Sequence, residues 1–226
     1  MLTEEYKLDN PIYFALAETH KEFCINYAGA KFYTPQHCAF GGFAVTENTI
    51  ETINEYSKLI NNFYVVGDKP NFGTSISLIK NIVCNQMIIQ NEIDYEITTE
   101  IIQLEEKHHH ELFELINLVQ PGFFKNKTTA LGDYYGIFKD NKLVAVTGKR
   151  VTMDAFTEVS AVVTHPNYTG KGFAKQLVSF VTNNIFEENK IPILHVAETN
   201  INAINLYEKL GYSTRRKISF WNLSTI

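Results

Sequence analysis

The stretch Val162-Val163-Thr164-His165-Pro166-Asn167-Tyr168-Thr169-Gly170-Lys171-Gly172-Phe173-Ala174 decides which fold we expect for this chain. A β-branched run leads into a turn with two glycines, and the pattern predicts that an amphipathic helix begins directly after them. Gly170 and Gly172 let main-chain N–H groups approach a ligand, because glycine has no Cβ. The N-terminus of the helix adds partial positive charge, so the turn is suited to bind pyrophosphate. Glycine is common in turns, and this pattern needs support from elsewhere in the sequence.

A second segment supplies that support. It runs His195-Val196-Ala197-Glu198-Thr199-Asn200 and continues through Ala203-Ile204 to Leu206-Tyr207-Glu208-Lys209-Leu210-Gly211-Tyr212. Together the two segments resemble motifs A and B of the GNAT superfamily, the acetyl-CoA-dependent N-acyltransferases. The match is closest to the subgroup that includes the glycine N-acyltransferase-like proteins.

The resemblance covers residues 96–226 and includes Pro121-Gly122-Phe123-Phe124 and Leu131-Gly132-Asp133-Tyr134. One departure concerns the phosphates of the co-substrate. Most members of the superfamily carry Arg just before the first glycine of the turn, and Gln or Arg three residues before that glycine. Here these positions are Thr169 and Asn167. We therefore expect weaker side-chain support for the phosphates around an intact main-chain cradle.

The resemblance implies a set of residues that bind acetyl-CoA. In GNAT proteins two neighbouring strands splay apart, the pantetheine arm pairs with one of them, and main chain corresponding to Val162 to Thr164 supplies the oxyanion donor. Asn200 resembles the asparagine of motif B that contacts the cofactor arm, and it is equally placed to cap a helix. Lys171 and Lys175 beside the turn are either phosphate ligands or ordinary surface lysines. The expected acetyl-CoA-binding residues are Val162, Val163, Thr164, Asn167, Thr169, Gly170, Lys171, Gly172, Phe173, Ala174, Asn200 and Tyr207.

Tyr207 is the candidate for the proton donor. N-acetylation needs a neutral amine, a donor for the developing oxyanion and a proton for the departing thiolate. A phenol with an ordinary pKa near 10 can protonate a thiolate whose conjugate acid has a pKa near 8.5. Tyr207 shares one face of the predicted helix with Ala203, Leu206 and Leu210. The alternative is therefore a core tyrosine whose hydroxyl has a structural partner. The family resemblance favours the catalytic interpretation.

The general base has more than one candidate. Glu158 is predicted to point to the same face of the central strand as Ser160, upstream of the acetyl-CoA site. A Glu within an apolar strand is costly unless it is paired or functional. The alternative to a base is a salt bridge with Lys149 or Arg150 on the neighbouring strand. His195 is a second candidate, although a single histidine in a strand is more often a core residue.

Composition and charge limit the partners and the cellular location that we expect for this protein. The chain has 226 residues, is 45% hydrophobic and carries a net charge of −5. Residues 1–95 contain 11 acidic and 6 basic residues, whereas residues 96–226 contain 14 of each. An acidic half argues against a nucleic-acid partner. The three scattered cysteines, the start of the chain and the lack of a long apolar run predict a cytoplasmic protein outside the membrane.

We expect an α/β GNAT fold with a mixed, mostly antiparallel sheet flanked by helices in residues 96–226. Residues 1–95 should form an additional N-terminal α+β domain, in which the order of elements suggests a degenerate GNAT-like half. No Gly-, Ser- or Pro-rich linker separates the two, so they should pack together. The predicted strands cover residues 63–66, 82–89, 101–104, 134–138, 143–151, 156–164, 193–196 and 212–221. The predicted helices begin at Pro11 and Phe173 and cover residues 47–59, 105–119 and 202–210.

These patterns predict an enzyme that transfers the acetyl group of acetyl-CoA to a small-molecule amine or aminoacyl substrate by direct attack on the thioester. The alternative is a non-catalytic GNAT-fold module that binds acyl-CoA as a sensor or structural element, and a longer acyl donor is a third option. We expect no metal, because consecutive residues such as His108-His109-His110 point in different directions on a helix. A monomer and a homodimer both remain open.

Overall fold

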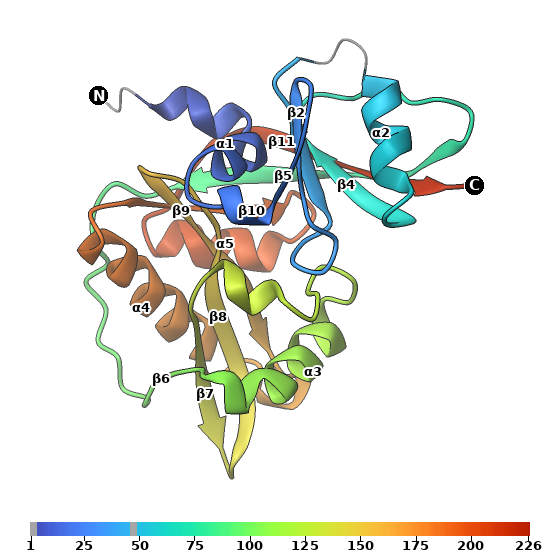
Figure 1. The fold of residues 1–226 in the computed structure, drawn as a ribbon. Helices are drawn as coiled ribbons and strands as arrows, with labels where there is room; N and C mark the ends of the chain where they lie inside the picture. The colour runs from blue at the N-terminus through green and yellow to red at the C-terminus, as the bar shows by residue number, and fades with distance from the viewer. Residues whose placement is uncertain (1–3, 46–48) are drawn as a thin grey trace.

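The computed structural model describes residues 4–45 and 49–226, and its centre is one 11-stranded sheet with the order β1-β2-β3-β4-β11-β5-β10-β9-β8-β7-β6 (Figure 1). The strands are β1 (Cys24–Tyr27), β2 (Ala30–Tyr33), β3 (Phe40–Phe43), β4 (Asn62–Val66), β5 (Ile76–Ile88), β6 (Ile102–Gln103), β7 (Tyr134–Lys139), β8 (Lys142–Thr152), β9 (Phe156–Thr164), β10 (Ile191–Ala197) and β11 (Ser213–Thr225). The sheet is mixed, because β10 pairs in parallel with β9 and β3 pairs in parallel with β4.

Five α-helices of the described residues cover this sheet: α1 (Pro11–Ala17), α2 (Thr49–Ser57), α3 (His109–Val119), α4 (Phe173–Glu187) and α5 (Ile201–Lys209). None of them is long and apolar enough to cross a membrane. Pro11 opens α1, as the sequence predicts, because its missing N–H is not needed in the first turn. The helix predicted over residues 47–59 appears as α2, and its predicted first residues lie outside the described part.

Adjacent residues of each strand reach different cores, which is why helices lie on both faces. Tyr134 of β7 packs with α3, whereas Tyr135 packs with α4 and α5. In β4, Tyr64 packs with α1 and its neighbour Phe63 packs with α2. The strands and helices predicted for residues 96–226 are confirmed within a few residues. The short strands β1, β2 and β3 were not predicted, since four-residue segments carry little periodic signal.

The sheet continues across residue 95 because β5 lies between β10 and β11. Ile88 of β5 is opposite Ile193 of β10 on one side and opposite Ser213 of β11 on the other. Both pairings are antiparallel, and β5 pairs with β11 along its whole length. A strand from residues 1–95 therefore holds together two strands of residues 96–226. The boundary that we expected at residue 95 does not separate two sheets.

The connection from β5 to β6 is held against α4 by two amide side chains. The Asn183 amide accepts from the Ile93 N–H at 2.8 Å and donates to the Ile93 carbonyl at 3.0 Å. Gln176 Oε1 accepts from the N–H groups of Thr98 and Thr99 at 2.9 and 2.8 Å. Such contacts replace the hydrogen bonds that a free linker would make with water.

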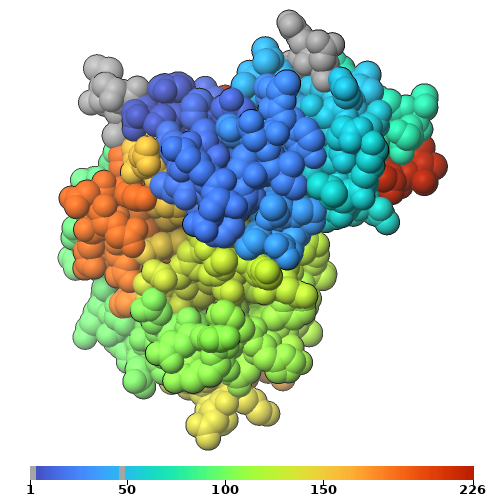
Figure 2. All heavy atoms as spheres, viewed as in Figure 1, coloured from blue at the N-terminus to red at the C-terminus, as the bar shows by residue number. Residues whose placement is uncertain are grey.

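A second contact joins the N-terminal segment to the segment that follows α3. Figure 2 shows the blue N-terminal residues and the yellow-green residues meeting without a gap on the surface in view. The Lys127 N–H donates to the Gln36 carbonyl at 3.0 Å, and the Thr128 hydroxyl donates to the His37 carbonyl at 2.7 Å. The two parts of the chain pack directly on each other, as the absence of a flexible linker predicts.

Candidate active site

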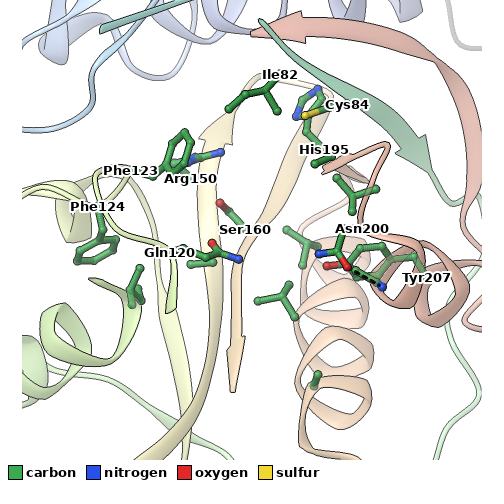
Figure 3. A pocket seen from close by; sticks show the side chains of 18 of the residues that line it. Ile82, Cys84, Gln120, Phe123, Phe124, Arg150, Ser160, His195, Asn200 and Tyr207 are labelled. Carbon is green, nitrogen blue, oxygen red and sulfur yellow. Dashed lines mark hydrogen bonds between the residues drawn. The ribbon is translucent and has the colours of Figure 1, made fainter. Parts of the chain in front are cut away.

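A wedge opens in the sheet between β9 and β10. The two strands pair at three positions, from Ile191 opposite Phe156 to Ile193 opposite Glu158. Beyond Glu158, β9 stays paired with β8, while β10 stays paired with β5. A cavity of about 500 Å³ is lined by residues of both strands beyond this point. Figure 3 shows Asn200 and Tyr207 on one side of this cavity and Gln120 and Phe124 on the other.

A β-bulge lies on the β9 side of the wedge. Gly148 of β8 is opposite Ser160, but Val146 is opposite Val163, so Ala161 and Val162 together face one residue of β8. Ala161 has a φ of 51°, a left-handed conformation that is uncommon for a residue with a Cβ. A bulge leaves main-chain groups out of the regular ladder and turns side chains. The main chain here is thus available to a group bound in the wedge.

The bulge also decides which of the acetyl-CoA-binding residues predicted in β9 face the cavity. Val162 lines the cavity together with Ser160 and Ala161. Val163 is buried in the core beneath α3, whereas Val162 packs against the core of α4 and α5. Thr164 is half-buried at the end of β9, outside the cavity lining. Any contact of Val163 or Thr164 with a ligand in the wedge would have to come from the main chain.

The glycine turn forms the opening of helix α4. Gly170 and Gly172 have φ values of 76° and 78°, and no atom lies within 4 Å of the position that a Cβ on either residue would take. Gly172 is the N-cap of α4 and makes no side-chain cap, so the first N–H groups of the helix have no side-chain partner. The turn therefore combines open space with unsatisfied main-chain donors, which fits a bound phosphate group.

Thr169 and Asn167 form hydrogen bonds within the turn. The Thr169 hydroxyl donates to the Pro166 carbonyl at 3.1 Å, and the Asn167 N–H donates to His165 Nδ1 at 3.2 Å. These bonds stabilise the turn from within. Phe173 anchors the start of α4 in the core, while Ala174 lines the cavity.

Two lysines contribute positive charge beside the turn. Lys171 Nζ lies 4.8 Å from the centroid of the Tyr168 ring, and Lys175 Nζ lies 4.1 Å from that of Tyr95. Neither lysine forms an ion pair within the described residues. Both ammonium groups thus keep their charge available near the start of α4.

Asn200 and Tyr207 line the other wall of the cavity from α5. Asn200 is the N-cap, since its side chain accepts from the Ala203 N–H at 3.2 Å, which confirms one of its two predicted roles. The Tyr207 side chain is 6% exposed and packs in the core with Ile204 and Leu210. Burial raises the pKa of Tyr207. Its hydroxyl forms no hydrogen bond with any described residue, so the hydroxyl is free to serve a ligand.

Glu158 is enclosed and ion-paired. Its carboxylate accepts from Arg150 Nε at 3.1 Å and from Arg150 Nη2 at 3.2 Å, and it contacts His195 Nδ1 at 2.8 Å. Burial by itself would raise the pKa of Glu158, but Arg150 and His195 lower it to about 2. Lys149 pairs with Glu188 instead. Glu158 does not line the cavity, so these contacts favour the ion pair with Arg150 over the role of general base.

The His195 ring is held in place by Gln86, a residue that the sequence patterns did not indicate. Gln86 Oε1 accepts from Arg215 Nη1 at 3.0 Å, and Gln86 Nε2 donates to the Leu8 carbonyl at 2.7 Å. The second proton of Gln86 Nε2 therefore points to His195 Nε2 at 3.0 Å, which must accept it. The Nδ1 side of the ring faces Glu158. Because Lys80, Asn81 and Asn85 are polar residues of the same strand, no local signal singled out Gln86.

We expect Glu158 to control the acid stability of the protein. Its folded-state pKa of about 2 lies below its ordinary value of 4.5. The resulting stability is therefore present above pH 4.5 and is lost as the pH falls towards 2. Glu158→Gln should lower the free energy of unfolding at pH 7 by about 3 kcal/mol, because it removes this contribution and leaves Arg150 buried without its anion.

Urea unfolding at pH 7, 5 and 3 measures this effect. Wild-type protein should lose stability steeply between pH 5 and 3, and Glu158→Gln should lose clearly less. Glu188→Gln is the matched control. Glu188 is 43% exposed and pairs with Lys149, which lies next to Arg150 on β8. Its pH profile should follow that of the wild type. An equally steep loss in Glu158→Gln would contradict the assignment.

The three histidines at the start of α3 do not converge. His108 Nδ1 accepts from the Glu105 N–H at 2.9 Å, and His110 contacts Glu114 at 3.4 Å. In the part of the chain that the structure describes, no three His, Cys, Asp or Glu side chains are grouped to hold a metal ion. His108 instead completes the capping box of the short 3-10 helix Glu106–His108, and His110 makes a surface contact within α3.

Comparisons with known proteins agree with this geometry. Residues 134–221 match the family model described as FR47-like protein. A structure from Novosphingobium aromaticivorans, assigned to the GNAT family of acetyltransferases, aligns with a TM-score of 0.87 and 26% identity over 97% of this chain and 98% of that chain. A GCN5-related N-acetyltransferase-like protein from Streptococcus suis aligns with a TM-score of 0.64 and 14% identity over 92% of each chain. Among curated proteins, no sequence matched the chain.

A GCN5-related N-acetyltransferase from Kribbella flavida also aligns, with a TM-score of 0.56 and 13% identity over 89% of this chain and 88% of that chain. The similarity to the first structure covers nearly the full length of both proteins, including most of residues 1–95. The chain therefore has the α/β fold of the GNAT acetyltransferases, with a mixed sheet flanked by helices.

Proposed function

We propose that this protein is an N-acetyltransferase that uses acetyl-CoA. The observation that carries the proposal is the wedge between β9 and β10, which combines a glycine turn at the start of α4 with Tyr207 on the cavity wall. Main-chain donors suited to phosphates lie at the turn, and a cavity for the reacting groups lies between the strands. This arrangement matches what a thioester donor with a pyrophosphate requires.

The reaction assigns one task to each wall of the cavity. The amine nitrogen attacks the thioester carbon, and a main-chain N–H at the bulge of Ala161 and Val162 stabilises the negative charge on the carbonyl oxygen. As the carbon–sulfur bond breaks, Tyr207 donates its proton to the sulfur. The amine loses its own proton to water, because Glu158 is enclosed and the Nε2 lone pair of His195 is occupied by Gln86. Water then restores the Tyr207 proton.

The residues at the glycine turn fit the phosphates of the co-substrate. Gly170 and Gly172 leave a space that a Cβ would fill, and the main-chain N–H groups of Phe173 and Ala174 open α4. Lys171 lies between the two glycines and Lys175 lies in the first turn of α4, so both add positive charge to this part of the chain. Most members of the superfamily have Arg at the position of Thr169 and Gln or Arg at the position of Asn167. In this chain the two lysines provide the positive charge instead. Asn200 and Val162 lie where the pantetheine arm would pass.

Gly172→Glu should abolish tight binding of acetyl-CoA while the fold is retained. The substitution puts a side chain and a negative charge into the open space at the start of α4. Repulsion from the phosphates and loss of access to the main-chain donors should weaken binding by about 100-fold or more. Isothermal titration calorimetry with acetyl-CoA measures the affinity, and thermal unfolding monitors the fold.

Gly122→Glu is the matched control for the effects of backbone strain and charge. Gly122 also has a left-handed φ, of 93°, and also has no atom within 4 Å of an added Cβ, but it lies on the exposed loop after α3. It should lose similar stability and keep acetyl-CoA affinity within a few-fold of the wild type. Tight binding by Gly172→Glu would show that the turn is not the phosphate site.

Release of free thiol from acetyl-CoA in the presence of a panel of amines tests the proposed reaction. Amine-dependent release above the rate of hydrolysis supports an enzyme. Binding of acetyl-CoA without release for any amine would favour the alternative, a GNAT-fold module that senses or binds acyl-CoA. Longer acyl-CoA donors belong in the same panel, since residues from α3 extend the cavity beyond the wedge.

The remaining expectations belong to this proposal. The acceptor is a small amine or aminoacyl compound, the protein acts in the cytoplasm, and nucleic acid and membranes are not its partners. The closer resemblance to the glycine N-acyltransferase-like proteins also belongs to this proposal.

Gel filtration with light scattering distinguishes a monomer from a homodimer. The N-terminal part contributes directly to the cavity through Phe40, Ile82 and Cys84, which supports an acceptor site shared by both parts of the chain.

A further inference from the structure

We infer that the acceptor carries a carboxylate and a bulky apolar body, and that Arg150 and Tyr134 bind the carboxylate. The inference rests on the proposed function, because it identifies the substrate class of that same cavity. Among the described residues no Asp or Glu lines the cavity, and Arg150 is the lining residue that carries a permanent charge.

Arg150 retains donors for a ligand. Its Nε and Nη2 groups bind Glu158, whereas Nη1 forms no hydrogen bond with any described residue. The guanidinium group is held in place on its other side by the Phe40 ring, whose centroid lies 4.8 Å from Cζ. The side chain is 15% exposed and lines the cavity. A fixed guanidinium with a free edge is well suited to bind a carboxylate.

Tyr134 supplies a second and independent indication of a polar ligand. Its hydroxyl is buried and has no hydrogen-bond partner among the described residues, although Tyr134 lines the same cavity. Buried hydroxyl groups without partners are uncommon, because leaving such a group unpaired costs free energy. The charge of Arg150 acts on this hydroxyl and opposes the increase of its pKa that burial causes. A carboxylate bound by Arg150 would provide the missing acceptor.

Apart from Ser160 and His195, the lining around Arg150 is mainly apolar and comes from distant parts of the sequence (Figure 3). Phe40 of β3 lies edge-on to Phe123 and to Phe220, with ring centroids 6.3 and 5.6 Å apart. Ile82 and Cys84 of β5 complete the wall. Such a surface is stabilised when an apolar group covers it. Glycine, the smallest amino acid, would leave it uncovered.

An acyl chain is a poorer occupant of this end than the acceptor. A hydrocarbon chain would cover the free edge of Arg150 without replacing its hydrogen bonds with water, and it would leave the Tyr134 hydroxyl unpaired. A carboxylate satisfies both groups, and an aromatic or branched side chain covers the phenylalanines. An α-amino acid with a bulky apolar side chain meets both conditions, with its amine left to attack the thioester.

Wild-type protein with four acceptors tests the inference without any substitution. The probes are L-phenylalanine, L-phenylalaninamide, phenethylamine and glycine, and the measurement is kcat/KM for thiol release from acetyl-CoA. We expect L-phenylalanine to exceed the amide and phenethylamine by about 10- to 100-fold, the range for hydrogen bonds to a charged group. It should exceed glycine at least tenfold, because glycine lacks the apolar body. Equal or better use of the amide or phenethylamine would overturn the carboxylate assignment.

Two variants test the residues themselves. Tyr134→Phe removes only the hydroxyl and should reduce the preference for L-phenylalanine over its amide several-fold. The double variant Arg150→Gln/Glu158→Gln removes the buried pair together, so no single charge is left unpaired. It should reduce the preference to within about threefold. Lys149→Gln is the control, because this neighbouring cation lies outside the cavity lining and should keep the full preference. An unchanged preference in both Tyr134→Phe and the double variant would overturn the roles of Arg150 and Tyr134.

A binding measurement separates failure of the inference from failure of the proposed reaction. The probes are N-acetyl-L-phenylalanine and its amide, titrated into the protein with CoA present. A tenfold or greater preference for the carboxylate, lost in the double variant, supports the site even if no amine is acetylated. In that case the transferase proposal fails and the carboxylate site stands. Equal binding of the two probes, or binding of neither, would overturn the inference.

Discussion

Tyr207→Phe should reduce kcat by a factor of 10² to 10⁴ and leave the affinity for acetyl-CoA within a few-fold of the wild type. The ring packs in the core with Ile204 and Leu210, and phenylalanine preserves that packing. The hydroxyl forms no hydrogen bond with a described residue, so its removal should leave no buried group unpaired. Loss of the proton donor is then the main effect. Single-turnover kinetics isolates the chemical step, and calorimetry measures the affinity.

Tyr212→Phe is the matched control for this substitution. The Tyr212 ring lies 6.2 Å from that of Tyr207, and its hydroxyl contacts Thr182 Oγ1 at 2.7 Å in the core. Removing it leaves Thr182 without a partner and should cost about 1–3 kcal/mol of stability with kcat unchanged. The two variants should thus separate activity from stability. Near-normal turnover by Tyr207→Phe, with chemistry rate-limiting, would make Tyr207 a core residue only.

Residues 96–226 produced alone should fail to fold. Although they contain both sequence motifs, they lack β5, the strand that pairs with both β10 and β11. Without it the two strands lose their common hydrogen-bonding partner, and Ile193, Ile218 and Phe220 lose the side of the core that α1 and β5 supply. Near-UV circular dichroism and amide NMR dispersion should show no fixed tertiary packing, and thermal unfolding should show no cooperative transition.

Two fragments produced together provide the control. A chain divided between the exposed residues Gln90 and Asn91 keeps β5 in residues 1–90 and the rest of the sheet in residues 91–226. Co-expression should yield a complex with a cooperative unfolding transition, because every strand pairing remains available. A folded, cooperative fragment of residues 96–226 would instead show that these residues form an independent domain.

Sequence patterns were sufficient for the elements that depend on neighbouring residues. The helix after Gly172, the hairpin of β7 and β8, and β9 follow from periodicity and turn residues within short windows. The glycine turn was identified for the same reason, since two glycines at this spacing favour the left-handed backbone that Gly170 and Gly172 adopt. The position of Tyr207 on the inner face of α5 followed from helical spacing.

Contacts between distant residues were not predictable in this way. No local pattern indicates that β5 lies between β10 and β11, or that Gln86 of β5 holds the His195 ring in place. The choice of Arg150 over Lys149 as the partner of Glu158 depends on which face of β8 each side chain takes. The bulge at Ala161 shifts the alternation of β9, which a regular strand pattern does not anticipate.

The sequence by itself determined the α/β class, the glycine turn and the helix that carries Tyr207, because these depend on backbone preferences and periodicities that act over a few residues. The GNAT fold was expected from the resemblance of the two motifs to that superfamily. The tertiary structure alone decided how the cavity is completed. Phe40, Arg150 and Phe220 meet there from three strands. Their chemistry as a site arises from packing and from a shared low-dielectric environment, which strengthens the Arg150–Glu158 pair and makes the unpaired Tyr134 hydroxyl costly. Such effects depend on distances in space, and separation along the chain does not encode them.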